Sequence, residues 1–486
     1  MTDGLNRMAA LCRQRCETVM AAYAYGDMNL DTFVTLQAQK VKNNIQNGSM
    51  RDSADFVDSA VSVAEKLLGK EEASKLRESL KMKVICTADH HGSLYCSQFL
   101  QGDLLFALIL EKLGERDLYV PVMAAGQVEL ENSTYSRGIC AYSSRENKLF
   151  LPIFPAKYSV QLASHTLPVT RDMTDRFRKR FVDSGEDSVI MQTLSEICRD
   201  IYDAREVVDS QSFSDQTTVI GHKLMSHVLS GGTPSFAYLE METVIRSLLL
   251  EELSDESSLL FKLLYVKKVR EMAVQKRNPE GLSLGDFLFR AADEKGRKVM
   301  LSLTADGFLT GKDWRKEPVS FSTDPKVLTG LIRERKVFPG VFTEALLIFF
   351  ERGITWMGGM FQASYMPRWQ NELVCVLEET GYDTEARLIR GYDCSGYVCG
   401  PMLLLYGGKD FATTAGPVEL WRKPVSFDSV RRLAKQTSLW DGHKIGLSEM
   451  YFDLVLRDER ENDWYKTIAE ELFRNYPENI VTDGRE

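Results

Sequence analysis

The chain has 486 residues, of which 44% are hydrophobic and 27% are charged. This composition excludes a disordered or collagen-like chain, and the length allows roughly two to four domains at about 150 residues each. The formal net charge is −9, from 60 Lys and Arg against 69 Asp and Glu. Such a surface repels phosphate backbones, so nucleic-acid binding is disfavoured.

The chain contains nine cysteines, and no two of them have the Cys-x2-Cys spacing of structural zinc sites. The first 20 residues are polar and amphipathic, without the apolar core of a signal peptide. The longest apolar runs, such as 345–350, fall far short of the ~20 residues that a bilayer span needs. We therefore expect a soluble, cytoplasmic protein with reduced thiols and no membrane partner.

The first 170 residues change from a helical pattern to an alternation of strands and helices. Residues 1–80 favour helices, one of which, over 57–68, stops at Gly69. Residues 82–87 predict a buried strand, 102–113 a helix ending at Gly114, and 118–123 a second strand. Strand, helix and strand at this spacing predict a βαβ unit with two parallel strands.

The rest of the chain is mixed in pattern. A β-hairpin is predicted from 138–142 and 149–154. The predicted helices between 170 and 295 cover 172–183, 187–206, 215–229, 236–253 and 257–276. Beyond 297 we expect short strands at 298–303, 345–350 and 401–405, and a closing amphipathic helix over about 461–475.

These elements predict an α/β or α+β fold that is rich in helix, with a mixed β-sheet core and a helical insertion. Four segments are expected: an N-terminal helical segment (1–80), an α/β core with the candidate active-site loops (81–169), a helical subdomain or cap (170–296) and a mixed C-terminal region packing on the core (297–486). A near-repeat, WRKEPVSF at 314–321 and WRKPVSF at 421–427, is compatible with a duplication or with coincidence.

The most informative segment is Asp89-His90-His91-Gly92, which follows the first predicted strand and contains two of only six histidines. In open α/β sheets, ligands collect at the carboxyl ends of the strands. A carboxylate beside two imidazoles provides a general base with an orienting acid, or ligands for a divalent metal. We therefore take Asp89, His90 and His91 as candidate catalytic residues, against the alternative of a turn in which Asp89 caps the next helix.

The triplet Asp89-His90-His91 resembles the signature of the DHH phosphoesterases, which also follows a strand. In that family aspartate motifs lie on earlier strands of the same sheet, and a glycine- and histidine-rich motif lies near the C-terminus. Residues 1–80 here favour helices and offer no strand with an aspartate, and the later motif is missing. The resemblance therefore covers only three residues and their strand, and we do not assign the chain to that family.

Three further groups are candidates for binding a substrate. The loop after the second predicted strand carries Gln127, Asn132, Tyr135 and Arg137, of which the arginine suits a phosphate or carboxylate. If the two strands are parallel, this loop opens on the same side as Asp89. The glycine- and aromatic-rich stretch from 353 to 408 adds Gln362 and Tyr365, and His165 is a possible third acid–base group.

The sequence thus predicts an enzyme acting on a small polar or anionic metabolite. Its chemistry would be acid–base or metal-assisted group transfer, ligation or hydrolysis, with transferase, ligase and hydrolase equally open. A non-enzymatic interaction protein that uses the helical segment 170–295 as a docking surface is the alternative.

Overall fold

The main sheet has five parallel strands in the order β13-β12-β1-β2-β6. The computed structural model describes residues 4–15, 25–115, 117–132, 134–142, 148–184, 188–459 and 463–481. Its strands are β1 (Val84–Cys86), β2 (Tyr119–Ala124), β6 (Ser235–Glu240), β12 (Thr355–Gly359) and β13 (Tyr397–Cys399). The parallel pairing of β1 with β2, through Cys86 and Val122, confirms the predicted βαβ unit.

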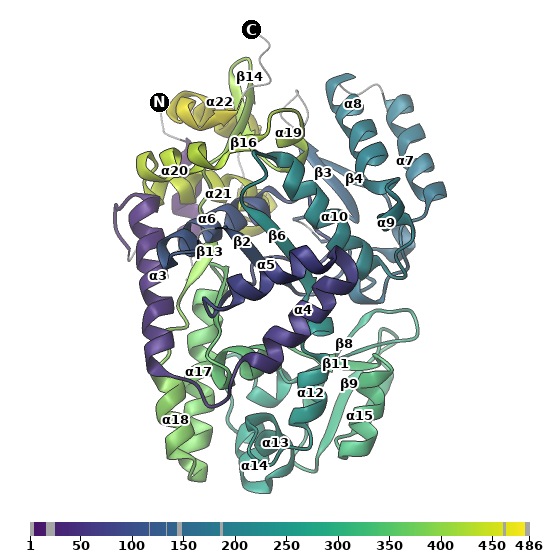
Figure 1. Ribbon diagram of the computed structural model, residues 1–486, viewed down its shortest axis with the longest axis vertical. Coiled ribbons are helices and arrows are strands. Elements are labelled where there is room, and N and C mark those ends of the chain that lie inside the picture. Colours follow the sequence, from purple (N-terminus) through teal and green to yellow (C-terminus); the bar gives the residue numbers. More distant parts are fainter. Residues whose placement is uncertain are drawn as a thin grey trace.

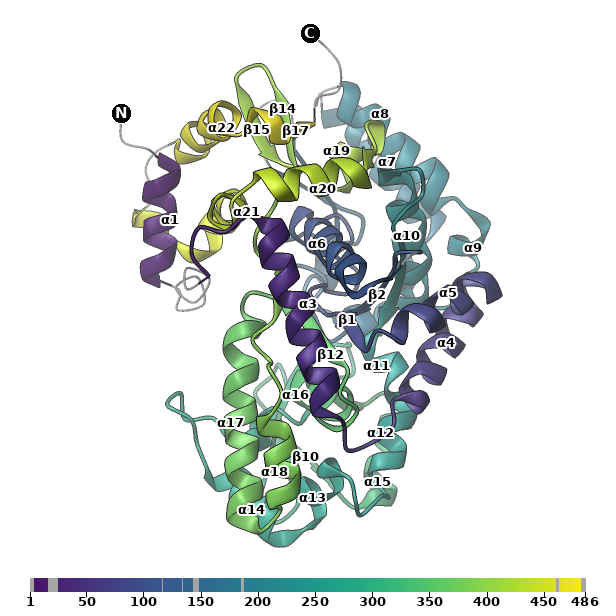
Figure 2. The same ribbon diagram turned by 60° about the vertical axis from the view of Figure 1, so that its left-hand side comes forward.

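Helices cover both faces of this sheet. Val120 and Val122 of β2 join the core cluster that includes α3 (Leu30–Asn47) and α6 (Ser97–Leu113). Tyr119 and Met123 of the same strand join a second cluster that includes α4 (Ala54–Leu68) and α5 (Lys70–Leu80). Successive side chains of a strand point to opposite faces, and helices cover both faces, so both sets of strand residues are buried, as in other parallel sheets (Figures 1 and 2).

Helix α6 connects β1 to β2 and ends where the sequence predicts. Gly114 has a left-handed backbone with φ 100°, and its N–H donates to the carbonyls of Leu110 and Glu111. Glycine adopts this conformation without the penalty that a Cβ brings, so it closes the helix. Gly69 likewise ends α4 with φ 93°.

The second sheet is antiparallel and lies in the lower part of Figure 1, at the end of the molecule away from the two chain termini. Its strand order is β10-β9-β8-β7-β11. The strands are β7 (Phe289–Ala292), β8 (Lys298–Leu303), β9 (Phe308–Lys312), β10 (Pro318–Ser322) and β11 (Val337–Pro339). Helices α11 (Met241–Val244), α12 (Arg246–Glu252), α13 (Leu259–Tyr265), α14 (Lys267–Gln275), α15 (Pro325–Arg333) and α16 (Val341–Ala345) accompany it. This unit, which we call the second lobe, is inserted between β6 and β12.

The remaining helices lie mainly around the main sheet. They are α1 (Gly4–Arg15), α7 (Arg171–Ser184), α8 (Ser188–Ile197), α9 (Arg205–Val208), α10 (Phe213–Val228), α17 (Gln362–Thr380), α18 (Asp383–Arg390), α19 (Pro417–Arg422), α20 (Phe427–Gln436), α21 (Leu439–Leu454) and α22 (Trp464–Asn475). The strands β14 (Leu405–Gly408), β15 (Phe411–Thr414) and β17 (Ile480–Val481) form a small third sheet. The predicted hairpin is present as β3 (Gly138–Tyr142) and β4 (Lys148–Pro152), and its turn lies outside the described residues.

Three predicted elements are wrong. The predicted helix 236–253 begins as strand β6, because an unbroken apolar run does not distinguish a buried parallel strand from a helix. The predicted strand 345–350 is helical, with every residue of the run buried. Of the predicted strand 401–405, only Leu405 is in a strand.

The fold is α/β and rich in helix, with several separate sheets. The division of the chain into four segments stays a prediction. The main sheet takes its strands from three of these segments. The two near-repeats differ locally, because Trp314 lies in an exposed turn and Trp421 in helix α19. Among the described residues, none of the helices combines the length and the apolar character needed to cross a membrane.

Candidate functional site at the carboxyl edge of the main sheet

The five parallel strands of the main sheet bring the loops that follow them to one edge. The chain runs from β1 through β2 to β6 on one side, while β12 and β13 lie on the other side of β1. The strand order therefore reverses between β1 and β12, and such a switch point is where open α/β sheets bind ligands.

A side-chain contact joins the two loops at this switch point. The Thr87 hydroxyl, just after β1, donates to Gln362 Oε1 at 2.8 Å, and Gln362 Nε2 donates to the Trp356 carbonyl. Gly358 makes room for this contact, since a Cβ there would lie 2.0 Å from Gln362 Oε1. Gln362, predicted as a substrate ligand, is buried and ties the two strands together.

Replacing Gly358 with alanine is expected to lower the free energy of unfolding by about 1 to 3 kcal/mol, because the added methyl overpacks the site. Gly359→Ala is the matched control, since a Cβ at this neighbouring position meets no atom within 4 Å. Urea unfolding of both variants measures the difference. Equal stability of the two variants would contradict the role given to Gly358.

The structure places the three side chains of the Asp89-His90-His91 segment in different surroundings. Asp89 is 2% exposed, and its Oδ2 accepts a hydrogen bond from the Tyr238 hydroxyl at 2.7 Å. It lies beside Cys86 and Asp103, with one potential ligand atom of each residue within 4.8 Å of the others. Burial raises the pKa of Asp89 to about 7.

His90 is partly exposed and contacts Tyr135, so the structure brings these two predicted residues together. His90 Nδ1 lies 3.2 Å from the Tyr135 hydroxyl, which donates to the Glu129 carbonyl. The Tyr135 hydroxyl has one hydrogen, which it donates to Glu129, so it accepts a hydrogen bond from His90. Nδ1 therefore carries the proton of the neutral ring, and Nε2 keeps its lone pair. Burial, followed by the charge of Lys298, lowers the pKa of His90 to about 4, so the ring is neutral at pH 7.

His91 is buried and points to a different network. Its Nε2 donates to the Ser214 carbonyl at 3.0 Å, and the Ser214 hydroxyl donates to Glu240 Oε2 at 2.9 Å. Glu240, at the end of β6, also binds Arg335 Nη2 at 3.1 Å. The Asp-His-His segment is therefore connected through His91 to the end of β6 and to the second lobe.

Glu242 lies two residues beyond β6 and holds the loop that follows β2. Its two carboxylate oxygens accept the backbone N–H groups of Gly126 and Gln127 at 2.8 and 2.7 Å. Burial, followed by the charge of Glu240, raises the pKa of Glu242 to about 7. The Gln127 side chain donates to Glu344 Oε1 at 2.8 Å and to the Pro339 carbonyl, so this predicted ligand links the sheet edge to the second lobe.

A pocket opens beside Glu242, between the sheet edge and the second lobe. Its polar lining consists of Ser164, His165, Glu242, Arg246 and Arg335, and its apolar lining comes from α12, α15 and β11. His165 Nε2 donates to the Arg335 carbonyl, and its Nδ1 accepts from the Ser164 hydroxyl, each at 2.8 Å. We call this the β6 pocket.

Arg246 is the distinctive side chain of the β6 pocket. It is half-buried, and among the described residues no carboxylate oxygen lies within 4 Å of its guanidinium; its hydrogen bond to the Thr243 hydroxyl is long, at 3.5 Å. Burial and the nearby charge of Arg335 lower the pKa of Arg246, against the weaker opposing effect of the Glu240 and Glu242 charges. Two neighbouring guanidinium groups, one without an ion-pair partner, suit a ligand that carries negative charge.

Three other predicted ligands make contacts of their own. Asn132 accepts the backbone N–H groups of Thr134 and Tyr135 and so shapes its own turn. Arg137 pairs with Glu131 and donates to the Phe154 carbonyl, and the structure records no contact between Arg137 and Asp89. Tyr365 packs against Trp369, and burial raises its pKa.

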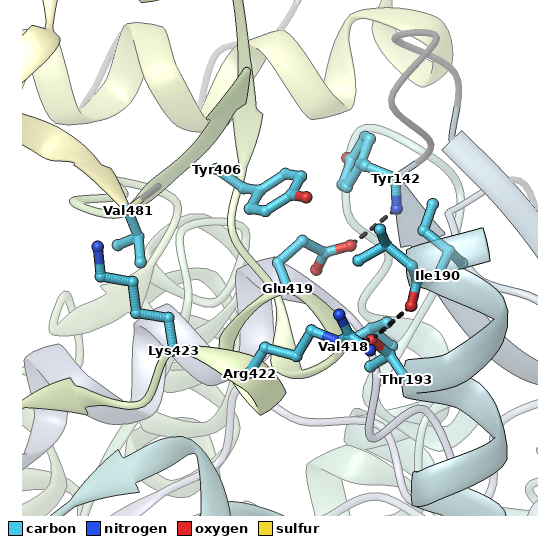
Figure 3. Close-up of a pocket in the computed structure, with 10 residues that line it drawn as sticks. Tyr142, Ile190, Thr193, Tyr406, Val418, Glu419, Arg422, Lys423 and Val481 are labelled. Atoms are coloured by element: carbon cyan, nitrogen blue, oxygen red, sulfur yellow. Dashed lines mark hydrogen bonds between the residues drawn. The ribbon is translucent and has the colours of Figure 1, made fainter. Parts of the chain in front are cut away.

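A second pocket lies away from this edge, between α8, α19 and the third sheet (Figure 3). Two of its charged groups are already engaged: Glu419 accepts the backbone N–H groups of Tyr142 and Gly416, and Arg422 Nε donates to the Thr193 hydroxyl at 2.6 Å. Burial raises the pKa of Glu419 to about 7. We favour the β6 pocket because it holds two neighbouring guanidinium groups, one of which, Arg246, has no carboxylate within 4 Å among the described residues.

Sequence reasoning missed the residues that give this edge its charge. Glu240 and Glu242 were placed inside a predicted helix, and Arg335 carries no local signal. Asp103 does have a signal in the sequence, because it is the one charged residue in the run 97–110. An acidic residue within a buried helix points to a partner or a ligand.

Comparison with protein-family models, with curated proteins and with solved structures finds no match for this chain.

Proposed function

We propose that this chain is an enzyme that binds a small anionic metabolite in the β6 pocket and acts on it by acid–base chemistry. The observation that carries the proposal is Arg246, a half-buried guanidinium that lines a pocket without an ion-pair partner among the described residues. A buried cation of this kind is stabilised when a ligand supplies the missing negative charge.

Each polar group of the pocket has a role in this proposal. Arg246 and Arg335 hold the anionic group of the ligand. Glu242, with a pKa of about 7, exchanges a proton with the bound molecule near neutral pH. His91 acts as a positioning residue through Ser214 and Glu240, which fix Arg335. Such proton transfer accompanies group transfer, ligation and hydrolysis alike.

Millimolar inorganic phosphate or malonate is expected to raise the melting temperature, because an anion that binds the folded state stabilises it. Arg246→Gln should raise the anion concentration needed for half of this shift by roughly 10-fold or more, since a hydrogen bond to a charged group contributes about 1.5 to 3 kcal/mol. Differential scanning fluorimetry over a concentration series provides the measurement.

Arg137→Gln is the matched control, because it removes the arginine that the sequence predicts as the anion anchor. This variant should respond to the anions as wild type does. A loss of response in Arg137→Gln with a normal response in Arg246→Gln would make Arg137 the anion anchor. Equal responses in wild type and both variants would contradict the assignment of an anion site to the β6 pocket.

Glu242→Gln tests the catalytic part of the proposal. Once an anionic metabolite is found that the protein converts, this variant should lose most of the turnover, because glutamine does not exchange the proton. Turnover that survives in Glu242→Gln would contradict the assignment. If bound anions are never converted, the interaction-protein alternative is favoured.

A further inference from the structure

Three side chains with metal-binding chemistry meet beneath the carboxyl edge of the main sheet. Cys86 is the last residue of β1, Asp89 follows in the next loop, and Asp103 projects from α6, which covers this face of the sheet. A thiol and two carboxylates are thereby brought within 4.8 Å of one another. All three residues are buried, with exposed fractions of 0%, 2% and 0% respectively.

The protein satisfies only part of this cluster. Asp89 Oδ2 accepts from Tyr238, and the Cys86 thiol donates to Asp103 Oδ1 at 3.2 Å. The other oxygens, Asp89 Oδ1 and Asp103 Oδ2, are buried and have no hydrogen-bond donor among the residues that the structure describes. Within the described part of the chain, neither carboxylate has a lysine, arginine or histidine nitrogen within 4 Å.

Two buried carboxyl groups side by side need a positive charge or a shared proton. A shared proton would bridge the two carboxyl groups, with the thiol still donating to Asp103 Oδ1. A divalent cation would engage all three groups, including the two oxygens that lack donors. The thiolate among the donors favours a borderline-soft ion such as Zn²⁺ over Mg²⁺ or Ca²⁺.

We propose that Cys86, Asp89 and Asp103 bind one Zn²⁺-like divalent cation, with Tyr238 orienting Asp89. Binding releases to solvent both the thiol proton and the proton shared by the two carboxyl groups, and three protein ligands leave one coordination position for water. The histidines that the sequence offered as ligands are not part of this site, because His90 contacts Tyr135 and His91 contacts Ser214.

The test begins with the full chain, treated with a chelator, dialysed and titrated with Zn²⁺ or Co²⁺. We expect one equivalent of Zn²⁺ per chain by elemental analysis and a higher melting temperature after Zn²⁺ is restored. Co²⁺ should produce a near-ultraviolet thiolate-to-cobalt charge-transfer absorption, which reports the sulfur ligand directly.

Cys86→Ser should abolish that absorption, and Asp103→Asn should weaken Zn²⁺ binding at least 10-fold. Cys375→Ser is the control, because this partly buried cysteine lies on α17 and outside the cluster. An absorption that persists in Cys86→Ser places the metal elsewhere and overturns the proposal. Wild-type protein that takes up no stoichiometric metal and shows no thermal shift with Zn²⁺ also overturns it, whether or not the variants fold.

This site and the β6 pocket are tested separately. The anion-dependent thermal shift is measured on chelated protein, so its outcome does not depend on the metal. The metal titration is performed in a buffer that binds metals weakly and contains no phosphate or malonate, so its outcome does not depend on the anion pocket.

Discussion

Replacing Arg352 with methionine is expected to lower the free energy of unfolding by about 3 to 5 kcal/mol. This side chain is 2% exposed and lies just before β12. Its Nη2 binds Asp55 at 2.6 Å and Glu252 at 2.7 Å, and its Nη1 lies 3.6 Å from Glu351. Glu252 and Glu351 are each 1% exposed. Removing the arginine takes away the hydrogen-bonded partner of Glu252 and one of the two guanidinium groups, Arg51 and Arg352, that lie 3.6 Å from Glu351.

Urea unfolding followed by circular dichroism measures the loss, with an unchanged m-value as the sign that two-state behaviour is retained. Arg390→Met is the control, because Arg390 pairs with Glu378 at the surface and such pairs contribute about 1 kcal/mol or less. A loss below about 1 kcal/mol in Arg352→Met would show that Arg51, which also contacts Glu252 and Glu351, carries the network instead.

Stability is expected to fall as pH rises from 6.5 to 8.5. Burial raises the pKa values of Glu242 and Glu419 to about 7 and that of Glu351 to about 8, from an ordinary value of 4.5. In this window the folded protein holds protons that the unfolded chain has lost, so deprotonation favours unfolding. The expected loss is about 3 to 4 kcal/mol over the window.

The window is chosen to separate these carboxyl groups from buried histidines, which act in the opposite direction. Burial lowers the pKa of His443 to about 3, so this residue reduces stability as pH falls below about 6.5. Glu419→Gln should make the slope between pH 6.5 and 8.5 shallower, and the exposed Glu334→Gln should leave it unchanged. A wild-type stability that is flat or rises across the window would contradict the expectation.

The sequence was most informative where a local signal and the tertiary structure agree. The strand before Asp89, the helix closed by Gly114 and the parallel partner strand were all predicted, because turn residues bound each apolar run. Periodicity failed at 236–240 and 345–350, where residues are buried on all sides and strand and helix look alike.

The candidate site was predictable in position but not in composition. The rule that ligands gather at the carboxyl ends of parallel strands pointed to the loops after β1 and β2. It gave no information on which strand would lie beside β2, and that neighbour, β6, supplies Glu240 and Glu242. Arg137 was chosen because of its loop, but its ion pair with Glu131 depends on distances that a sequence does not reveal.

Because β1 pairs with β12, the main sheet can be completed only late in the synthesis of the chain. Val84 pairs with Thr355, so β1 leaves the ribosome long before its neighbour on that side exists. Until then the βαβ unit has an apolar strand with an open edge, which is prone to aggregate and slow to find its partner. The residues proposed to bind a cation are synthesised first, by Asp103, whereas the β6 pocket needs the chain to Pro339. The three proposed cation ligands are therefore synthesised before the sheet can be completed, whereas the residues of the β6 pocket are complete only after most of the second lobe has been made.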